Sequence, residues 1–259
     1  MLSFHKKVSV IFLSFIFLTS FLFAQETKEY NETFSLSSTG TVSVDNYKGT
    51  ITVEAWDKNE VSVYAKIEPD DDGWNSTSPE EQIERCEVRF RNSGNYVSIE
   101  TNYEKNRGWG SETRAFVHYT IKMPATAELK IDDYKSEIKI ENLNSEIELE
   151  TYKGRVNIDN FSGSIVVDTY KGEVEVDFVE LKDYASFDTY KGDIKLVLPS
   201  SSKFDFDFDL GRKGDYRSDF EMMMSRYNSD DGDLRGKVNG GGPTIKFSTY
   251  KGEVYLRKK

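Results

Sequence analysis

Cysteine and histidine are almost absent from this sequence of 259 residues. Cys86 is the one cysteine, so no disulfide can form within the chain, and no zinc-ligand spacing is present. The sequence also contains no phosphate-binding loop and no nucleophile motif. We therefore expect a non-catalytic protein without a cofactor.

Long apolar runs are equally scarce, because the sequence has one, from residue 8 to residue 23. It follows the basic start His5-Lys6-Lys7 and ends before Ala24, which is typical of a secretory signal peptide over residues 1–24. The run is short for a membrane span, and no cysteine follows it for lipid attachment. We expect a mature chain without a transmembrane segment, exported to the periplasm, the cell surface or the medium. Export without disulfides fits a bacterial envelope.

Positive charge is in deficit, since the formal net charge is −11 and becomes −13 when Lys6 and Lys7 leave with the signal peptide. Such an acidic chain is not expected to bind nucleic acid or anionic lipid directly. Acidic residues also gather at 70–73 and 230–233, but neither segment has the spacing of an EF-hand. Solvation is the expected role of these acids, with Ca²⁺ binding as the weaker alternative. His118 is expected to pack or to face solvent rather than to bind a metal.

What the sequence has in abundance is one repeated phrase, in which an acid and a Thr, Asn or Asp precede Tyr-Lys-Gly. Weaker copies lie at 142–145 and 160–163, so that Leu143, Tyr152, Phe161 and Tyr170 follow one another at intervals of nine residues. Such internal repetition predicts stacked structural units. Tyrosine occupies the phrase at Tyr47, Tyr134, Tyr152, Tyr170, Tyr190 and Tyr250, with Ser in place of Gly in the copy at Tyr134.

Each nine-residue unit can hold a strand of about five residues and a corner of about four. One unit cannot bury its apolar face alone, but stacked units can. We predict an all-β fold, a single-stranded parallel β-solenoid with two units in each coil, because Tyr units alternate with Leu or Phe units. The alternative is an antiparallel meander or sandwich, in which the phrase would form a hairpin turn.

The expected organisation has three parts. Residues 1–24 form the signal peptide, and residues 25–125 form an N-terminal β region continuous with the solenoid. This region includes a hairpin around Asn92-Ser93-Gly94-Asn95. Residues 126–259 form the repeat solenoid, which a polar loop insertion interrupts at 199–243.

Two columns of side chains are the candidate surface features of this solenoid. The tyrosines are expected to stack in the interior, with an aromatic platform for glycans as the alternative. Stacked lysines about 5 Å apart would repel each other by a little under 1 kcal/mol, and the acid three residues before each lysine is expected to offset this. The positions are Tyr134, Tyr152, Tyr170, Tyr190 and Tyr250, and Lys135, Lys153, Lys171, Lys191 and Lys251.

The phrase at 149–156 resembles the recurrent "T-x-S-G-D-I" phrase of DUF4097, a bacterial domain family of unknown function that carries the label adhesin. The segment at 40–63, Met123-Pro124 and Gly240-Gly241-Gly242 also resemble this family. Tyr-Lys departs from it, because many members have an apolar residue and Ser there. The resemblance implies an exported, repetitive, β-solenoid-like fold at the cell envelope and supplies no catalytic residues.

Together these observations predict an exported, non-catalytic β-repeat protein of the bacterial envelope, an adhesin or a structural binding module. A glycan or an envelope protein is the expected partner. An envelope-stress or assembly factor that binds a protein partner is the first alternative. A glycan-active enzyme is the second.

Overall fold

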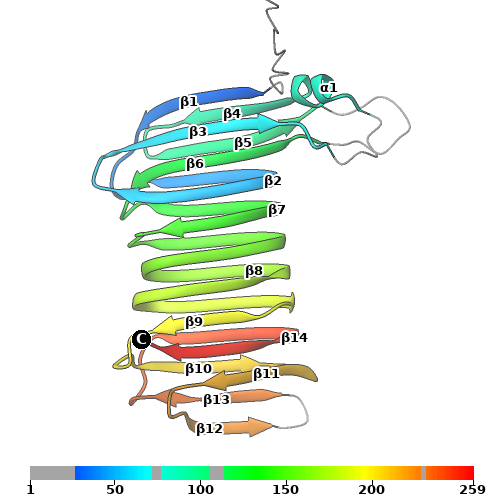
Figure 1. Ribbon diagram of the computed structural model, residues 1–259. Helices are drawn as coiled ribbons and strands as arrows, with labels where there is room; N and C mark the ends of the chain where they lie inside the picture. The colour runs from blue at the N-terminus through cyan, green and yellow to red at the C-terminus, as the bar shows by residue number, and fades with distance from the viewer. Residues whose placement is uncertain (1–26, 72–76, 105–113, 229–231) are drawn as a thin grey trace, which may run out of the picture.

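The all-β prediction is confirmed by the computed structural model, which describes residues 27–71, 77–104, 114–228 and 232–259 (Figure 1). One 14-stranded sheet contains the whole described chain apart from its turns and the short helix α1 (Pro79–Glu84). The predicted signal peptide lies outside the described residues. The strands are β1 (Lys28–Ser35), β2 (Thr41–Trp56), β3 (Glu60–Glu68), β4 (Cys86–Asn92), β5 (Tyr96–Tyr103), β6 (Phe116–Pro124), β7 (Glu128–Glu141), β8 (Glu146–Lys191), β9 (Ile194–Leu198), β10 (Phe204–Asp209), β11 (Lys213–Ser218), β12 (Met223–Asn228), β13 (Asp233–Val238) and β14 (Thr244–Lys258).

The repeat region forms the middle of the sheet as a continuous coil of parallel strands. Strand β8 runs for 46 residues through several turns of this coil (Figure 1). Leu129 on β7 pairs with Ile147 on β8, and Ile138 pairs with Val156, so successive coils are offset by 18 residues. This offset equals two nine-residue units, as expected. Parallel pairing of neighbouring repeats excludes the antiparallel meander for this region.

Both ends of the sheet are antiparallel, so the sheet as a whole is mixed. At the N-terminal end β1 pairs with β3, β3 with β6, and β4 with β5, all in antiparallel orientation. At the other end β13 pairs with β10 and β12 in the same manner. The prediction of a parallel solenoid therefore describes the middle of the sheet and not its two ends. The predicted hairpin is confirmed by β4 and β5.

The N-terminal region joins the repeats through β2, which lies between β6 and β7 in the sheet. Val42 of β2 pairs with Leu129 of β7 in parallel register, although the two are far apart in sequence. Strand β2 is thus the first coil of the stack, and Tyr47 on it lies above Tyr134. No helix among the described residues is long and apolar enough to cross a membrane.

The insertion at 199–243 corrects the prediction of a loop, because it contains β10 to β13. In strand β10, Phe204, Phe206 and Phe208 alternate with aspartates in the sequence, which is typical of a half-buried strand, and the three phenylalanines are buried. Strands β11 and β13 are mostly polar, and no residue of β11 is fully buried, so hydrophobic periodicity could not reveal them. Strand β14 pairs with β8 and β9 on one side and with β10 on the other, so in the sheet it lies between the coil and the strands of the insertion.

Glycine is required at the Tyr-Lys-Gly corner because successive coils touch there through their backbones. A Cβ added at Gly172 would lie 2.2 Å from the carbonyl oxygen of Gly154, and one at Gly192 would lie 1.7 Å from that of Gly172. No side chain can occupy such a space without moving the backbone. The glycine column therefore fixes the spacing and register of the coils.

Gly172→Ala should destabilise the protein by about 3 kcal/mol, the upper part of the range for overpacking. The control is Gly94→Ala in the β4–β5 hairpin, where the φ of +77° is unfavourable but no atom lies within 4 Å of the added Cβ. Backbone strain alone should make that change cost about 1 kcal/mol. Urea denaturation of both variants measures the difference. Equal losses would show that the coils do not touch at Gly172.

Candidate functional site: two side-chain columns at one corner

Six tyrosine rings stack along one edge of the coil. Tyr47 stacks on Tyr134 with ring centroids 4.7 Å apart and an interplanar angle of 5°. The next four contacts have centroid distances of 4.9, 4.7, 4.9 and 5.0 Å and pass through Tyr152, Tyr170 and Tyr190 to Tyr250. These spacings match the separation of neighbouring strands, so the backbone sets the ring spacing. Arg114 lies 4.1 Å from the Tyr47 ring and covers one end of the stack.

The tyrosines lie outside the coil, which corrects the prediction that they fill its interior. Tyr134, Tyr152, Tyr170, Tyr190 and Tyr250 are 39 to 47% exposed. The reason is the alternation of the strand, which continues through this corner. Within the phrase 167–170, the valine and the threonine are buried, whereas the aspartate and the tyrosine face outward.

The opposite corner differs, because its central side chains do lie in the interior. Leu143 and Phe161 are buried, and the Ser162 amide donates to the Leu143 carbonyl across neighbouring coils. Asn142 and Asn160 precede them with φ of 62° and 54°, in the left-handed region. This conformation reverses the alternation, so the next side chain turns inward. The two kinds of unit therefore differ in the direction of their central side chain.

Beneath the tyrosines, the residues that precede them form a buried polar column. It begins with Asn46 and Asp133 and continues with Thr151, Thr169, Thr189 and Thr249. Asp133 accepts hydrogen bonds from the Ser136 amide at 2.8 Å and from the Thr151 hydroxyl at 3.0 Å. Burial raises the pKa of Asp133 to about 6, although these hydrogen bonds act in the opposite direction. Asp133 is therefore the most perturbed carboxyl group at this corner.

A column of acids lies on one side of the tyrosine stack. Its exposed members are Asp45, Asp132, Glu150, Asp168 and Asp188. Burial and then the neighbouring carboxylate Asp132 raise the pKa of Asp45, and burial followed by Asp168 does the same for Asp188. A groove of about 530 Å³ is lined by the first four acids and by the tyrosines from Tyr47 to Tyr170. Like charges thus repel each other along this groove.

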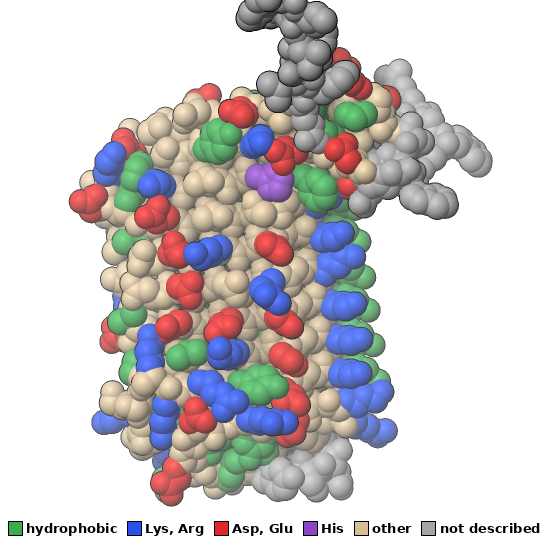
Figure 2. All heavy atoms as spheres, viewed as in Figure 1, with side chains coloured by type: hydrophobic (Ala, Val, Ile, Leu, Met, Phe, Trp, Pro, Cys, Tyr) green, Lys and Arg blue, Asp and Glu red, His purple; other side chains and the backbone are tan. Residues whose placement is uncertain are grey.

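The lysine column lies beside the tyrosine stack, and the two run side by side down one edge of the molecule (Figure 2). No ammonium group of its members forms an ion pair or hydrogen bond with the residues that the structure describes. This corrects the prediction that each acid neutralises the lysine three residues later. Three residues of extended chain span about 10 Å, and a tyrosine stands between. The members are Lys135, Lys153, Lys171, Lys191 and Lys251.

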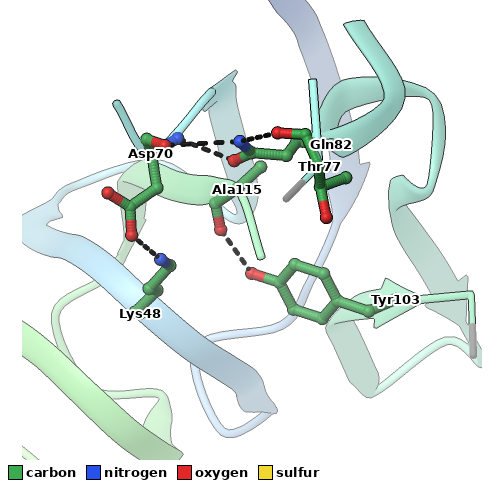
Figure 3. Close-up of polar contacts among 6 residues, drawn as sticks. All are labelled: Lys48, Asp70, Thr77, Gln82, Tyr103 and Ala115. Atoms are coloured by element: carbon green, nitrogen blue, oxygen red, sulfur yellow. Dashed lines mark hydrogen bonds and ion pairs between the residues drawn. The ribbon is translucent and has the colours of Figure 1, made fainter. Parts of the chain in front are cut away.

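Lys48 follows Tyr47 but leaves the lysine column. It is buried, and its ammonium forms an ion pair with Asp70, whose amide donates to the Gln82 side chain at 2.8 Å (Figure 3). Gln82 donates in turn to the carbonyl oxygen of Thr77 at 3.2 Å. The Lys48 side chain therefore packs within the N-terminal region and does not extend the lysine column. The column has five members and not six.

A second groove of about 550 Å³ opens on the lysine side. Its lining combines the lysine column with the corner glycines and, from the next position of the repeat, Arg155, Glu173 and Asp193. Arg155 and Glu173 form an ion pair at 2.8 Å, and the Asp193 carboxylate accepts from the Glu253 amide at 2.9 Å. The groove therefore has a cationic side and a side that carries both donors and acceptors.

The chemistry of this edge is limited by the way in which the rings stack. Each internal ring covers the faces of its neighbours, so the column presents ring edges and hydroxyl groups to solvent. A sugar that stacks on aromatic faces has no free face along the column. The unpaired lysines remain as the groups with unused hydrogen-bonding capacity, since each ammonium has three donors.

The other candidates from the sequence are outside this site. The described residues contain no cluster of three or more metal-binding side chains. Asp72, Gly73, Asp230 and Asp231 of the two acidic segments lie outside the described residues. The Thr50 hydroxyl lies 3.0 Å from Nδ1 of His118, and burial lowers the pKa of this histidine. Cys86 is buried, and burial raises the pKa of its thiol to about 12.

Two members of the site were not assigned to it from the sequence. Tyr47 was recognised as a copy of the phrase, but its 87-residue separation from Tyr134 gave no reason to place it on the same stack. Asp133 replaces the threonine of the other copies, and this substitution is the signal that it lies in the buried column.

Tyr152→Ala should cost about 2 kcal/mol more than Tyr96→Ala, because Tyr152 loses two ring contacts worth about 1 kcal/mol each. Tyr96 is a matched control, since it is 40% exposed against 42% for Tyr152 and has no ring contact among the described residues. Chemical denaturation of the two variants tests this. Equal losses of stability would mean that the stacked rings add nothing beyond their buried area.

The raised pKa of Asp133 predicts a pH-dependent stability. Between about pH 4 and pH 6 the unfolded chain loses this proton while the folded chain keeps it, so stability falls as pH rises, by about 3 kcal/mol in total. Asp133→Asn should remove this fall, and Asn46 shows that the column accepts an amide. The free energy of unfolding from pH 4 to 7 measures it. Parallel curves for the variant and the unmodified protein would contradict the prediction.

Comparison with known proteins agrees with this architecture. The model of the family Toastrack DUF4097 matches residues 23–257. A "putative cell adhesion protein" from Clostridium sporogenes ATCC 15579 is similar in structure, with 11% identity, a TM-score of 0.57, and coverage of 90% of this chain and 100% of that chain. This similarity concerns the fold alone.

A weaker match is a "putative adhesin" from Bacteroides fragilis NCTC 9343, with 10% identity, a TM-score of 0.27, and coverage of 91% of this chain and 99% of that chain. No curated protein matches the sequence. The family match covers nearly the whole chain and agrees with the resemblance carried by the repeats. The chain belongs to the Toastrack DUF4097 family.

Proposed function

We propose that this protein is an exported, non-catalytic binding module of the bacterial cell envelope, of the adhesin type. The observation that carries the proposal is the column of five lysines that have no partner among the described residues. Four of these side chains are exposed and that of Lys153 is half-buried. Charged side chains that repeat in register and stabilise nothing nearby are expected to contact something outside the molecule. The names of the similar structures support adhesion as the activity.

Export is supported by the sequence of residues 1–24, which has the basic start, apolar run and small terminal residue of a signal peptide. Residues 25–259 would then form the mature protein, with residues 25–125 joined to the repeats through β2. The position of the mature protein in the periplasm, on the cell surface or in the medium follows from export and is part of the proposal.

The arrangement of the acids favours binding over catalysis. Glycoside hydrolysis needs two carboxyl groups held in unlike environments, one protonated and one ionised. The acid column instead repeats one exposed environment from coil to coil, and Asp133 points into a buried column of hydroxyl groups. Asp133 also lines the groove beside Asp132 and Glu150, but it is only 5% exposed, and its carboxylate accepts hydrogen bonds from Ser136 and Thr151.

A second candidate is an envelope assembly or stress factor that binds a protein. The observation in its favour is β12 at the end of the sheet order, where Met223 and Met224 are 62% and 42% exposed. An exposed edge strand with apolar side chains can add a strand from a partner. This candidate uses the end of the stack and not its corner, so the two are separable.

A panel of immobilised bacterial polysaccharides and envelope extracts tests the proposal. The purified protein should be retained saturably on at least one polysaccharide and should release no shortened products. If the protein instead binds a protein of the envelope extract, and the variant Met223→Ser/Met224→Ser loses this binding, the result would favour the assembly factor. Formation of products would overturn the non-catalytic reading.

A further inference from the structure

We propose that the lysine column and the glycine-floored groove beside it bind a linear acidic polysaccharide that lies along the stack of coils. The inference rests on the proposed binding function and names the class of ligand and the surface that takes it. One side of this groove is formed by Lys135, Lys153, Lys171, Lys191 and Lys251. The other side is formed by Arg155, Glu173 and Asp193.

The charge of the column requires an anionic ligand. Five ammonium groups recur at steps of about 4.8 Å, the spacing of the strands that carry them, and extend over about 19 Å. They repel one another, and none forms an ion pair with a carboxylate of the described residues. A ligand with a row of negative charges relieves all of these repulsions together. A single small anion relieves only one or two.

The second side of the groove decides which kind of polyanion fits. Glu173 and Asp193 lie there beside Arg155, so this side repels anions at two positions and accepts hydrogen bonds there. A phosphodiester chain has few hydroxyl donors to give to these carboxylates. A chain of uronic acids has carboxylates for the lysines and hydroxyl groups for Glu173 and Asp193. The mixed groove therefore favours a polysaccharide.

The rest of the surface limits where such a ligand can bind. The net charge of −11 gives the protein no general attraction for polyanions. The acid column, which includes Asp132, Glu150 and Asp168, repels them on the other side of the tyrosine stack. The lysine groove is thus a cationic strip on an acidic molecule. The backbone register of the coils holds its five positions at a regular spacing, which suits a ligand with a regular repeat.

The test uses oligogalacturonates as the probe and compares two variants with equal changes of charge. The first is Lys153→Gln/Lys171→Gln/Lys191→Gln in the column. The control is Lys122→Gln/Lys130→Gln/Lys139→Gln, whose lysines are exposed but are paired with Glu54, Glu148 and Glu141 away from the groove. Circular dichroism confirms that both variants keep the β fold.

We expect the unmodified protein to bind oligogalacturonate with an affinity that falls as salt rises, with a slope of log K against log salt of about −3.5 for five contacts. The column variant should bind at least tenfold more weakly, with the slope reduced by about 2. The control variant should bind like the unmodified protein. Methyl-esterified oligogalacturonate, which has the same chain without the charges, should not bind.

Equal binding by the two variants, or equal binding of the methyl ester, would overturn the assignment of the lysine column. Binding of poly(glycerol phosphate) with equal affinity would overturn the preference for a polysaccharide and would show that the groove recognises negative charge only. If the unmodified protein binds a neutral polysaccharide and no acidic one, this inference fails while the proposed function stands. If it binds no polysaccharide and retains only an envelope protein through β12, the proposed adhesin function fails as well.

Discussion

The structure depends on one backbone contact, the approach of a carbonyl oxygen to the glycine of the next coil. At Gly154, Gly172, Gly192 and Gly252 no side chain can be present, because its Cβ would lie 2.2 Å or less from that oxygen. The contact recurs at the same corner in the successive copies from Gly154 to Gly252, whereas Ser136 takes the glycine position in the copy at Tyr134. It therefore holds every coil in the same register, and each residue of the phrase meets its own copy above and below. The columns of tyrosine, lysine, acid and threonine all follow from this.

Register has opposite consequences for different side chains. Tyrosine gains from meeting its own copy, because flat rings stack at the strand spacing. The lysines and the acids destabilise the stack, because each column places like charges side by side. The tyrosine stack also keeps the two columns of opposite charge apart. A repeat that served stability alone could place uncharged residues at these positions. The retained repulsion is the physical argument that the lysine edge contacts a partner.

Much of the middle of the fold could be predicted from the sequence. The alternation of Tyr152 with Leu143 and Phe161 gave the coil of two units. The direction of the tyrosines could not be predicted, because it depends on left-handed φ at Asn160 and on its absence at Thr169, and both residues occupy the same position of the phrase. Lys48 leaves the column because it forms an ion pair with Asp70, which follows β3, and the repeat gives no sign of this contact. Strands β11 and β13 of the insertion could not be predicted because they carry few apolar residues.

The most direct test of the register is thiol cross-linking between positions of the lysine column. Cysteines replacing Lys153 and Lys171 would have Cα atoms about 4.8 Å apart, within reach of a disulfide or a short thiol-bridging reagent. Cysteines replacing Lys153 and Lys191 would be about 10 Å apart. Cys86 is buried and should not interfere. Mass spectrometry should show rapid cross-linking in the first pair and none in the second. Equal cross-linking in both pairs, or none in the first, would contradict the stacked corner.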